Sequence, residues 1–295
     1  MKSKLAKYGL LFVTPFMIVF LVFQLYPILY TLYLSFMREN DRRKLVFGGL
    51  RNFIYLAGDT VFWQSVANTW IIWTGCIIPQ LALALILAVL LSQYKIRGAN
   101  FFRAVFYLPN LVTAASIGVL FSVLLDWQTG TVNKMLLAAG LVQEPVYWMG
   151  SPNIARSLTS IIQWWMWFGH STIILTAGVK AISPELIEAS VVDGAGNGQR
   201  FFRITLPLLR PTLLYVAVTS LIGGMQIFDI PMSLTGGDGR PNRALMTMVL
   251  YVYNTAFRNK NYAYGAAVSY GIFIIILIVS LLFFRIIAPK ASDET

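Results

Sequence analysis

The chain has 295 residues, of which 57% are hydrophobic and only 12% are charged, and its formal net charge at pH 7 is +11. A soluble globular domain carries about 25% charged residues, so this composition excludes a protein whose whole surface faces water. The single cysteine excludes an intrachain disulfide, and the single histidine, His170, excludes a multi-histidine metal site. The positive charge does not by itself indicate nucleic acid, because basic residues also collect beside anionic lipid.

The N-terminus begins with a few lysines and continues as an apolar run over Tyr8–Phe36. A secretory signal has an apolar core of only about 7–15 residues, followed by small residues at a cleavage site. This run is longer and has no such site. We therefore interpret it as a retained first transmembrane helix.

Crossing the hydrocarbon core of a bilayer takes roughly 20 apolar residues in a helix. Six segments meet this requirement, and the alternating strands of an outer-membrane barrel are not seen. The predicted spans are Tyr8–Phe36, Val66–Leu91, Ala104–Leu125, Leu158–Gly178, Leu213–Leu234 and Gly265–Ile287. The sequence thus predicts an all-α membrane protein with six transmembrane helices.

The orientation of these spans is less clear from charge. Six spans place both termini on one side, and Lys and Arg divide almost evenly, 12 on that side and 11 on the other. Short loops are the best guide to which side is cytoplasmic. The N-terminal tail and Lys95–Arg103 are short and purely basic. They favour cytoplasmic termini.

A polar segment, Pro184–Pro211, lies between the fourth and fifth predicted spans. Ser183–Glu185 supplies an N-cap serine, a first-turn proline and an acid near the positive end of a helix dipole. We predict a helix to about Val192, stopped by Gly194, and a second short helix that ends before Leu206-Pro207. Such a helix–turn–helix lies on the membrane surface, either as an ordinary interfacial hairpin or as a docking element. The small residues Ala189 and Ser190 would let another chain approach closely.

Nothing in the chain indicates catalysis. The glycine-rich Gly236–Gly239 lacks the lysine and hydroxyl residues that complete a phosphate-binding loop, so we do not expect this chain to hydrolyse ATP alone. No convincing nucleophile–base set is present, since it would have to use His170, which we expect to be a core residue, or no histidine at all. We expect a non-enzyme with no catalytic residues, no metal and no cofactor of its own.

Residues Glu188–Ala195 read E-A-S-V-V-D-G-A, and I-T-L-P follows at Ile204–Pro207. This resembles the EAA loop in permease subunits of binding-protein-dependent ABC importers, whose pattern is E-A-A-x-x-x-G, about nine residues, and I-x-L-P. The chain departs from it only at Ser190, a small residue in place of alanine. Three more segments resemble the carbohydrate branch, the maltose, glycerol-3-phosphate and multiple-sugar type I permeases: Arg97–Val112, Met225–Gly237 and Tyr264–Arg285.

The resemblance implies a type I ABC importer transmembrane domain in the cytoplasmic (inner) membrane, multi-pass, with both termini in the cytoplasm. Residues 1–60 would form the first helix and an extracytoplasmic loop, residues 61–287 the permease core, and residues 288–295 a cytoplasmic tail. The segment 184–211 would be a cytoplasmic coupling helix-turn-helix. The coupling residues it implies are Glu185, Glu188, Ala189, Ser190, Asp193, Gly194, Ala195, Ile204, Leu206 and Pro207.

The resemblance also implies partners. They are a second, homologous permease subunit, an ATPase subunit dimer that binds the ATP and Mg, an extracytoplasmic sugar-binding protein, the sugar itself and membrane lipid, with no nucleic acid. The sequence does not name the sugar or say which permease subunit holds it.

A sugar offers hydroxyl groups and apolar ring faces, so aromatic and polar residues within the spans are candidates to contact it. The candidate pathway residues are Trp164, Trp165, Trp167, Gln226, Asp229 and Asn110. The three tryptophans would either stack on sugar or belong to the aromatic belt at the membrane interface. Asp229 would either line a cavity or cap a helix kink at Pro231.

Three alternatives remain beside the carbohydrate importer. A glycerol-3-phosphate importer needs cations in its pathway, and the inner portions of the predicted spans contain no Lys or Arg. An ion-coupled secondary transporter would need several buried carboxylates or inverted repeats, and Asp229 is the one candidate. A membrane enzyme would need a polar catalytic cluster. We therefore favour a neutral sugar, most simply an oligosaccharide.

Overall fold

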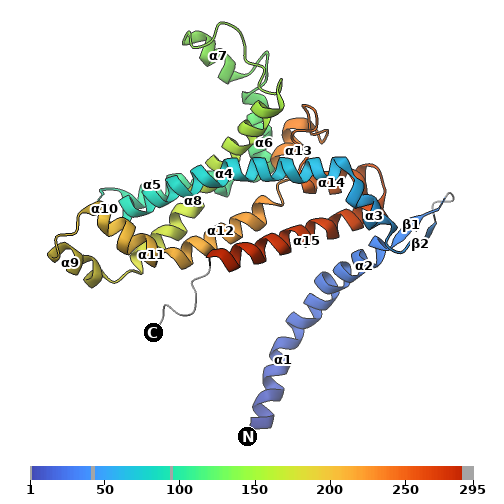
Figure 1. Cartoon of the computed structure of the whole chain (residues 1–295), viewed down its shortest axis with the longest axis horizontal. Coiled ribbons are helices and arrows are strands. Elements are labelled where there is room, and N and C mark those ends of the chain that lie inside the picture. Colours follow the sequence, from blue (N-terminus) through green and yellow to red (C-terminus); the bar gives the residue numbers. More distant parts are fainter. Residues whose placement is uncertain (1, 41–43, 94–95, 288–295) are drawn as a thin grey trace. The chain divides into compact units, whose positions relative to one another are not determined.

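The computed structural model describes residues 2–40, 44–93 and 96–287; the predicted tail at 288–295 and Lys95 lie outside them. The described residues are mostly helical, and their strands form one short β-hairpin (Figure 1). They form two units: one holds the residues up to Phe62 together with Val252–Ile274, and the other holds Trp63–Tyr251 with the rest of the last helix. The division of the chain at residues 60 and 61 stays a prediction.

The first unit contains the N-terminal helix and a small hairpin. Its elements are α1 (Lys2–Phe20), the π-helical segment η1 (Leu21–Leu25), α2 (Tyr26–Ser35), β1 (Met37–Glu39), β2 (Leu45–Phe47), α3 (Arg51–Gly58), η3 (Asn254–Arg258) and the first part of α15 (Tyr262–Ile287). The two strands pair antiparallel, with Met37 opposite Phe47. Asn52 on α3 donates hydrogen bonds to the carbonyls of Ser35 and Met37, at 2.9 and 2.7 Å, and so fixes the exit from α2.

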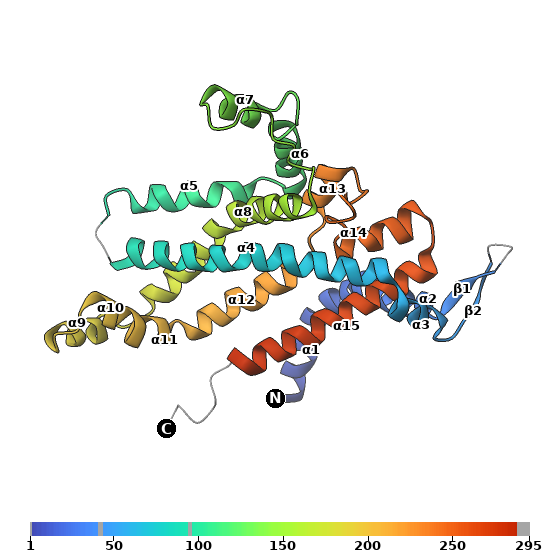
Figure 2. The ribbon, with the colours of Figure 1, turned by 45° about the horizontal axis from the view of Figure 1, so that its top comes forward.

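The second unit holds most of the helices. Its elements are α4 (Thr60–Gln93, which starts in the first unit), α5 (Ala99–Leu111), α6 (Ala114–Leu124), α7 (Thr131–Ala138), α8 (Pro152–Lys180), α9 (Pro184–Val192), α10 (Asn197–Arg200), the π-helical segment η2 (Phe201–Thr205), α11 (Leu206–Leu208), α12 (Arg210–Gly224), α13 (Asp229–Thr235) and α14 (Met248–Tyr253). Within this unit α9–α11 lie at one end of α4, α8 and α12, and α7 lies near α6 toward the other end (Figures 1 and 2).

Among the described residues, four helical segments are long and apolar enough to cross a membrane: Leu11–Ser35, Thr60–Ser92, Arg210–Thr235 and Tyr262–Arg285. They confirm the first, second, fifth and sixth predicted spans. The predicted fourth span corresponds to α8, which has 29 residues and a length of roughly 43 Å, enough to cross a bilayer. Its composition is more polar than that of the other four.

The third predicted span is not one straight helix. The segment Ala104–Leu125 is broken between α5 and α6, which meet at an angle of 88° and make one further span if they are counted together. Thr113 lies at the break with an extended backbone, and its side chain accepts a hydrogen bond from the Ser116 amide at 3.3 Å. A threonine N-cap therefore starts a new helix where hydropathy alone predicts continuity.

Helix α8 packs against several neighbours in the second unit. Buried apolar side chains join it to α4 and α12 in one cluster that includes Leu175, and to α6 and α13 in another that includes Met166. At Gly169 the backbones of α8 and α5 touch, since a Cβ atom there would lie 1.8 Å from the Phe106 carbonyl oxygen. Only glycine permits this approach. Helix α8 is thus packed against neighbours on more than one side. This packing determines which of its side chains can face a cavity.

Candidate functional site

The segment after α8 forms an exposed hairpin, α9–α11, whose first helix follows the sequence prediction. The Ser183 side chain accepts a hydrogen bond from the Glu185 amide at 3.3 Å, and Pro184 lies in the first turn. The helix ends at Val192, and Gly194 has a φ of +77°, a conformation that favours glycine. The predicted start and stop of α9 are confirmed.

The second half of the hairpin is longer than predicted. The helix begins at Asn197, passes through the π-helical segment η2 and continues as α11 to Leu208. The predicted stop before Leu206-Pro207 is wrong, because the helix continues through the π-helical segment η2 and includes Pro207 in α11. The chain then enters α12 at Arg210 with almost no linker.

Most of the predicted coupling residues are on the surface of this hairpin. Those that are exposed are Glu185, Glu188, Ala189, Asp193, Gly194 and Pro207, and those that are half-buried are Ala195, Ile204 and Leu206. Ser190 is buried, and its hydroxyl donates to the Ile187 carbonyl at 2.6 Å. Another chain can therefore approach closely at Ala189, which is exposed, but not at Ser190, which is buried.

The hairpin also exposes large apolar side chains. Leu186, Val192 and Phe202 are 51%, 87% and 67% exposed. Exposed apolar groups beside carboxylates are typical of a surface that another protein covers. The hairpin thus has the composition of a protein-docking surface.

Behind the hairpin is a hollow of about 400 Å³, bounded by the ends of α4 and α8 and by α9 and α10. Glu188 lines it together with the basic residues Lys180 and Arg200. Arg200 is further held by a hydrogen bond to Asn197. One carboxylate and two basic side chains therefore line the same hollow.

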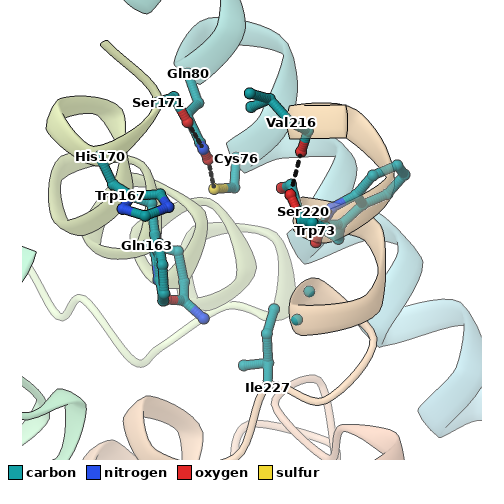
Figure 3. Close-up of a pocket in the computed structure, with 13 residues that line it drawn as sticks. Trp73, Cys76, Gln80, Gln163, Trp167, His170, Ser171, Val216, Ser220 and Ile227 are labelled. Atoms are coloured by element: carbon teal, nitrogen blue, oxygen red, sulfur yellow. Dashed lines mark hydrogen bonds between the residues drawn. The ribbon is translucent and has the colours of Figure 1, made fainter. Parts of the chain in front are cut away.

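A second feature, the inner cavity, lies between α4, α8 and α12 and has a volume of about 120 Å³ (Figure 3). Its wall includes Trp73, Gln80, Gln163, Trp167, His170 and Ser220. Gln163 and Trp167 on α8 lie across the space from Trp73 and Ser220 (Figure 3). Indole side chains from α4 and α8 thus border the cavity.

The polar groups of the inner cavity are only partly paired with one another. The Gln80 amide donates to the Ser171 hydroxyl at 2.7 Å, and the Trp73 indole N–H donates to the Ser220 carbonyl at 3.0 Å. No lining residue is Lys, Arg, Asp or Glu. Aromatic side chains with a few amide and hydroxyl groups and no charged side chain suit a neutral, polar ligand.

Of the predicted pathway tryptophans, only Trp167 lines this cavity. Trp165 packs edge-on against Phe121, with ring centroids 5.7 Å apart, and Trp164 lies against Phe168 at 5.9 Å. Neighbouring residues on a helix point in directions about 100° apart, so the three indoles do not share one face.

The other predicted pathway residues lie outside the inner cavity. Gln226 lies in the break between α12 and α13, and Asp229 begins α13; both are exposed. Both residues fall inside the span Arg210–Thr235, but at a break in its helix, since α12 ends at Gly224 and α13 begins at Asp229. Their role in the pathway stays a prediction. Asn110 lies in the last turn of α5 and does not line the cavity.

Sequence reasoning missed Trp73, Gln80 and Gln163, and it assigned His170 to the core, whereas His170 is half-buried and lines the cavity. The spacing of these residues in the sequence was a signal that they share a helical face. Trp73, Cys76 and Gln80 are three and four residues apart, and so are His170, Trp167 and Gln163. These intervals place each set on one helical face.

Together, the spanning helices, the docking hairpin and an uncharged polar cavity between helices define a multi-pass membrane protein of the solute-transport class. The chain belongs to the family described as binding-protein-dependent transport system inner membrane component, whose family model matches residues 69–293.

Relatives of known name cover nearly the whole chain. The lactose transport system permease protein LacF of Rhizobium radiobacter is 36% identical over 288 residues, 96% of each chain. The arabinooligosaccharides transport system permease protein AraP of Bacillus subtilis (strain 168) is 32% identical and covers 92% of this chain and 86% of its own. A solved structure, a bacterial alginate ABC transporter in complex with an alginate pentasaccharide-bound periplasmic protein, matches with a TM-score of 0.80 and 22% identity over 96% of this chain and 94% of that one. The fold is therefore that of an ABC importer permease.

Proposed function

We propose that this chain is the transmembrane permease subunit of an ATP-driven importer for a carbohydrate, specifically an oligosaccharide. The observation that carries this proposal is the exposed hairpin α9–α11, which presents Glu188 and the apolar side chain of Val192 on a surface suited to a soluble partner. The names of the relatives, which transport lactose and arabinooligosaccharides, support the substrate class. So does the uncharged, tryptophan-bordered inner cavity.

In this proposal both termini and the hairpin face the cytoplasm, and the chain lies in the cytoplasmic membrane. The hairpin docks on one subunit of an ATPase dimer, which supplies the ATP and Mg sites. A second, homologous permease subunit completes the pathway. An extracytoplasmic binding protein, like the periplasmic protein in the alginate transporter complex, delivers the sugar.

The path of the chain suggests how the hairpin would act. It leaves α8 at Lys180 and enters α12 at Arg210, and both of these helices line the inner cavity. A rigid-body movement of the hairpin would therefore be passed to two walls of the cavity at once. ATP binding would close the ATPase dimer and turn the cavity outward, and hydrolysis would return it inward. The chain itself performs no covalent chemistry, and the absence of a cofactor of its own stays a prediction.

Two of the three alternatives, the other transporters, fit the inner cavity less well. Glycerol-3-phosphate would need cationic partners for its phosphate, and no Lys or Arg lines the inner cavity. An ion-coupled transporter would need buried carboxylates, and none lines the cavity either.

The test is to purify the chain from membranes that express its transporter and to identify the subunits that come with it. Vesicles holding the assembled complex and a binding protein are then assayed with lactose, arabinooligosaccharides, maltodextrins and glycerol-3-phosphate, with and without ATP. We expect an ATP-hydrolysing subunit to co-purify and at least one of the sugars to enter only with ATP. Purification without an ATPase, or uptake that follows an ion gradient instead, would contradict the proposal.

A further inference from the structure

A larger cavity, the outer cavity, lies at the opposite end of α8 from the hairpin. It has a volume of about 420 Å³ and is formed by the end of α6 and the loop after it, the segment before α8, and the loop after α13. The residues that matter here are Asp126, Trp127, Gln128, Tyr147 and Arg240. They combine two aromatic rings with a carboxylate, an amide and a guanidinium group.

The two aromatic rings form an exposed pair. The Trp127 and Tyr147 ring centroids are 5.5 Å apart with an angle of 49° between the ring planes. The side chains remain 47% and 57% exposed. Much of both ring surfaces is therefore available to a ligand.

The pair is held in place by one buried amide. Asn133 on α7 is 2% exposed, and its side-chain N–H groups donate to the carbonyls of Trp127 and Val146, both at 3.0 Å. Its oxygen accepts from the Val146 amide at 3.2 Å and from the Trp148 indole at 3.1 Å. The two segments that carry the rings are thus tied together before any ligand arrives, which lowers the entropy cost of binding.

The carboxylate of this cavity is also fixed. One oxygen of Asp126, Oδ1, accepts hydrogen bonds from the Thr129 hydroxyl and amide, both at 2.7 Å, and from the Gln128 amide at 3.1 Å. The Thr129 hydroxyl bond, with the Thr129 amide after it, lowers the pKa of the Asp126 carboxyl below its ordinary value. Asp126 is therefore ionised at neutral pH, and its second oxygen can accept hydrogen bonds from ligand hydroxyls.

From this geometry we infer that the outer cavity is a second carbohydrate subsite, at which one sugar ring packs on the Trp127–Tyr147 pair and its hydroxyls bind Asp126, Gln128 and Arg240. This inference rests on the proposed function, since it takes the α7 end to be extracytoplasmic and the substrate to be a sugar. The inference goes further than the proposed function in one respect: the second subsite makes the transporter prefer longer oligosaccharides.

The length preference follows from the position of the two cavities along the same helices. On α8, Leu158 lines the outer cavity and Gln163 the inner one, five residues or roughly 7.5 Å apart along the axis. In the segment that follows α12, Leu234 lines the outer cavity and Ile227 the inner. A short sugar occupies one cavity at a time, whereas a longer chain reaches both and gains the contacts of each.

The test measures sugar binding to the assembled transporter in nanodiscs without the binding protein, so that hand-over from that protein does not mask the subsite. The probes are arabinooligosaccharides and maltodextrins from disaccharide to hexasaccharide, and the proteins are the unaltered complex and its Trp127→Ala and Trp127→Phe variants. We expect Trp127→Ala to weaken binding of the longer sugars about five- to tenfold, while disaccharide binding changes less than about twofold. Trp127→Phe, which keeps an aromatic ring, should restore most of the loss.

Each other outcome has a defined meaning. Equal binding by the unaltered and Trp127→Ala complexes at every chain length would show that the ring pair is only part of the membrane-interface belt, and would overturn the inference. An equal loss at every length would overturn it as well, because the residue would then support the site without selecting length. If the unaltered transporter neither binds nor imports any sugar of the series, the proposed function fails first, and the inference with it.

Discussion

The hairpin α9–α11 and the loop around α7 are both exposed, polar segments of the second unit, but their side chains are arranged differently. In the hairpin, Glu188 and Asp193 are exposed, and Val192 projects almost fully from the surface. In the α7 loop, Asn133 and Asp126 place their hydrogen bonds within the loop and hold two aromatic rings in a set position.

This difference separates two kinds of surface. On a surface that a large partner covers, side chains can be exposed in the free subunit, because the partner supplies their contacts. A surface that recognises a small molecule must be shaped in advance, since a small ligand makes too few contacts to order it. We therefore expect changes in the hairpin to alter coupling to the ATPase, and changes near α7 to alter ligand recognition or local order.

The largest effect is expected from charge reversal in the hairpin. Glu188→Lys would add a third cation to the hollow that already holds Lys180 and Arg200. The reversed charge would also stand on the surface that we propose the ATPase covers and would disfavour docking there, so ATP-dependent uptake should fall about a hundredfold. The measurement is initial uptake by vesicles holding the complete transporter, with the amount of assembled complex checked by gel filtration.

Glu144→Lys is the matched control for that change. Glu144 is exposed on the loop between α7 and α8 and lines neither cavity. Uptake should stay within about twofold of the unaltered protein. Equal losses in the two variants would mean that net charge matters and the position of the carboxylate does not.

A smaller, local effect is expected from Asn133→Ala. It would leave the Trp127 and Val146 carbonyls and the Trp148 indole without the amide that pairs them. Unpaired buried groups cost about 1–3 kcal/mol, so hydrogen exchange at the Val146 amide should speed up by about tenfold or more.

The exposed Asn153, near the start of α8, provides the control, and Asn153→Ala should leave exchange at Val146 unchanged. Amide exchange in α9 should be unaffected in both variants. Unchanged exchange at Val146 in Asn133→Ala would show that the α7 loop is not held as the hydrogen bonds suggest.

The smallest effect is expected in the inner cavity. Trp167→Ala removes one of the two indoles that border the cavity, so the assembled transporter should bind its sugar about fivefold more weakly. Trp165→Ala removes an indole from the same helix that packs on Phe121 and does not line the cavity. It should leave sugar affinity unchanged, and a larger loss from Trp165→Ala than from Trp167→Ala would reject the inner cavity as the sugar site.

The sequence predicted local features well where one residue type has one strong preference. Ser183, Pro184 and Gly194 marked the limits of α9 because capping and positive φ depend on few neighbours. Long apolar runs likewise predicted four spans correctly. The 88° bend between α5 and α6 was missed, since both halves are apolar and the Thr113 cap is one weak signal between them.

The cavities were harder to predict because they depend on how helices face one another. Trp164, Trp165 and Trp167 are equivalent by hydropathy, and only packing of α8 against its neighbours turns Trp167 toward the inner cavity. The i, i+3 and i+7 spacing of Trp73, Cys76 and Gln80 was readable from the sequence. The pairing of Trp127 with Tyr147, twenty residues away, depends on Asn133 and had no periodic signal.

The central claim, that the hairpin docks on an ATPase, is tested most directly by cross-linking. The chain has one cysteine, Cys76, which is buried, so Val192→Cys introduces a single exposed thiol on the hairpin. A bifunctional thiol–amine reagent should join this variant to the ATPase subunit of the purified complex, whereas Glu144→Cys on the α7 side should give no such product. Cross-linking to the ATPase from Glu144→Cys and not from Val192→Cys would contradict the account.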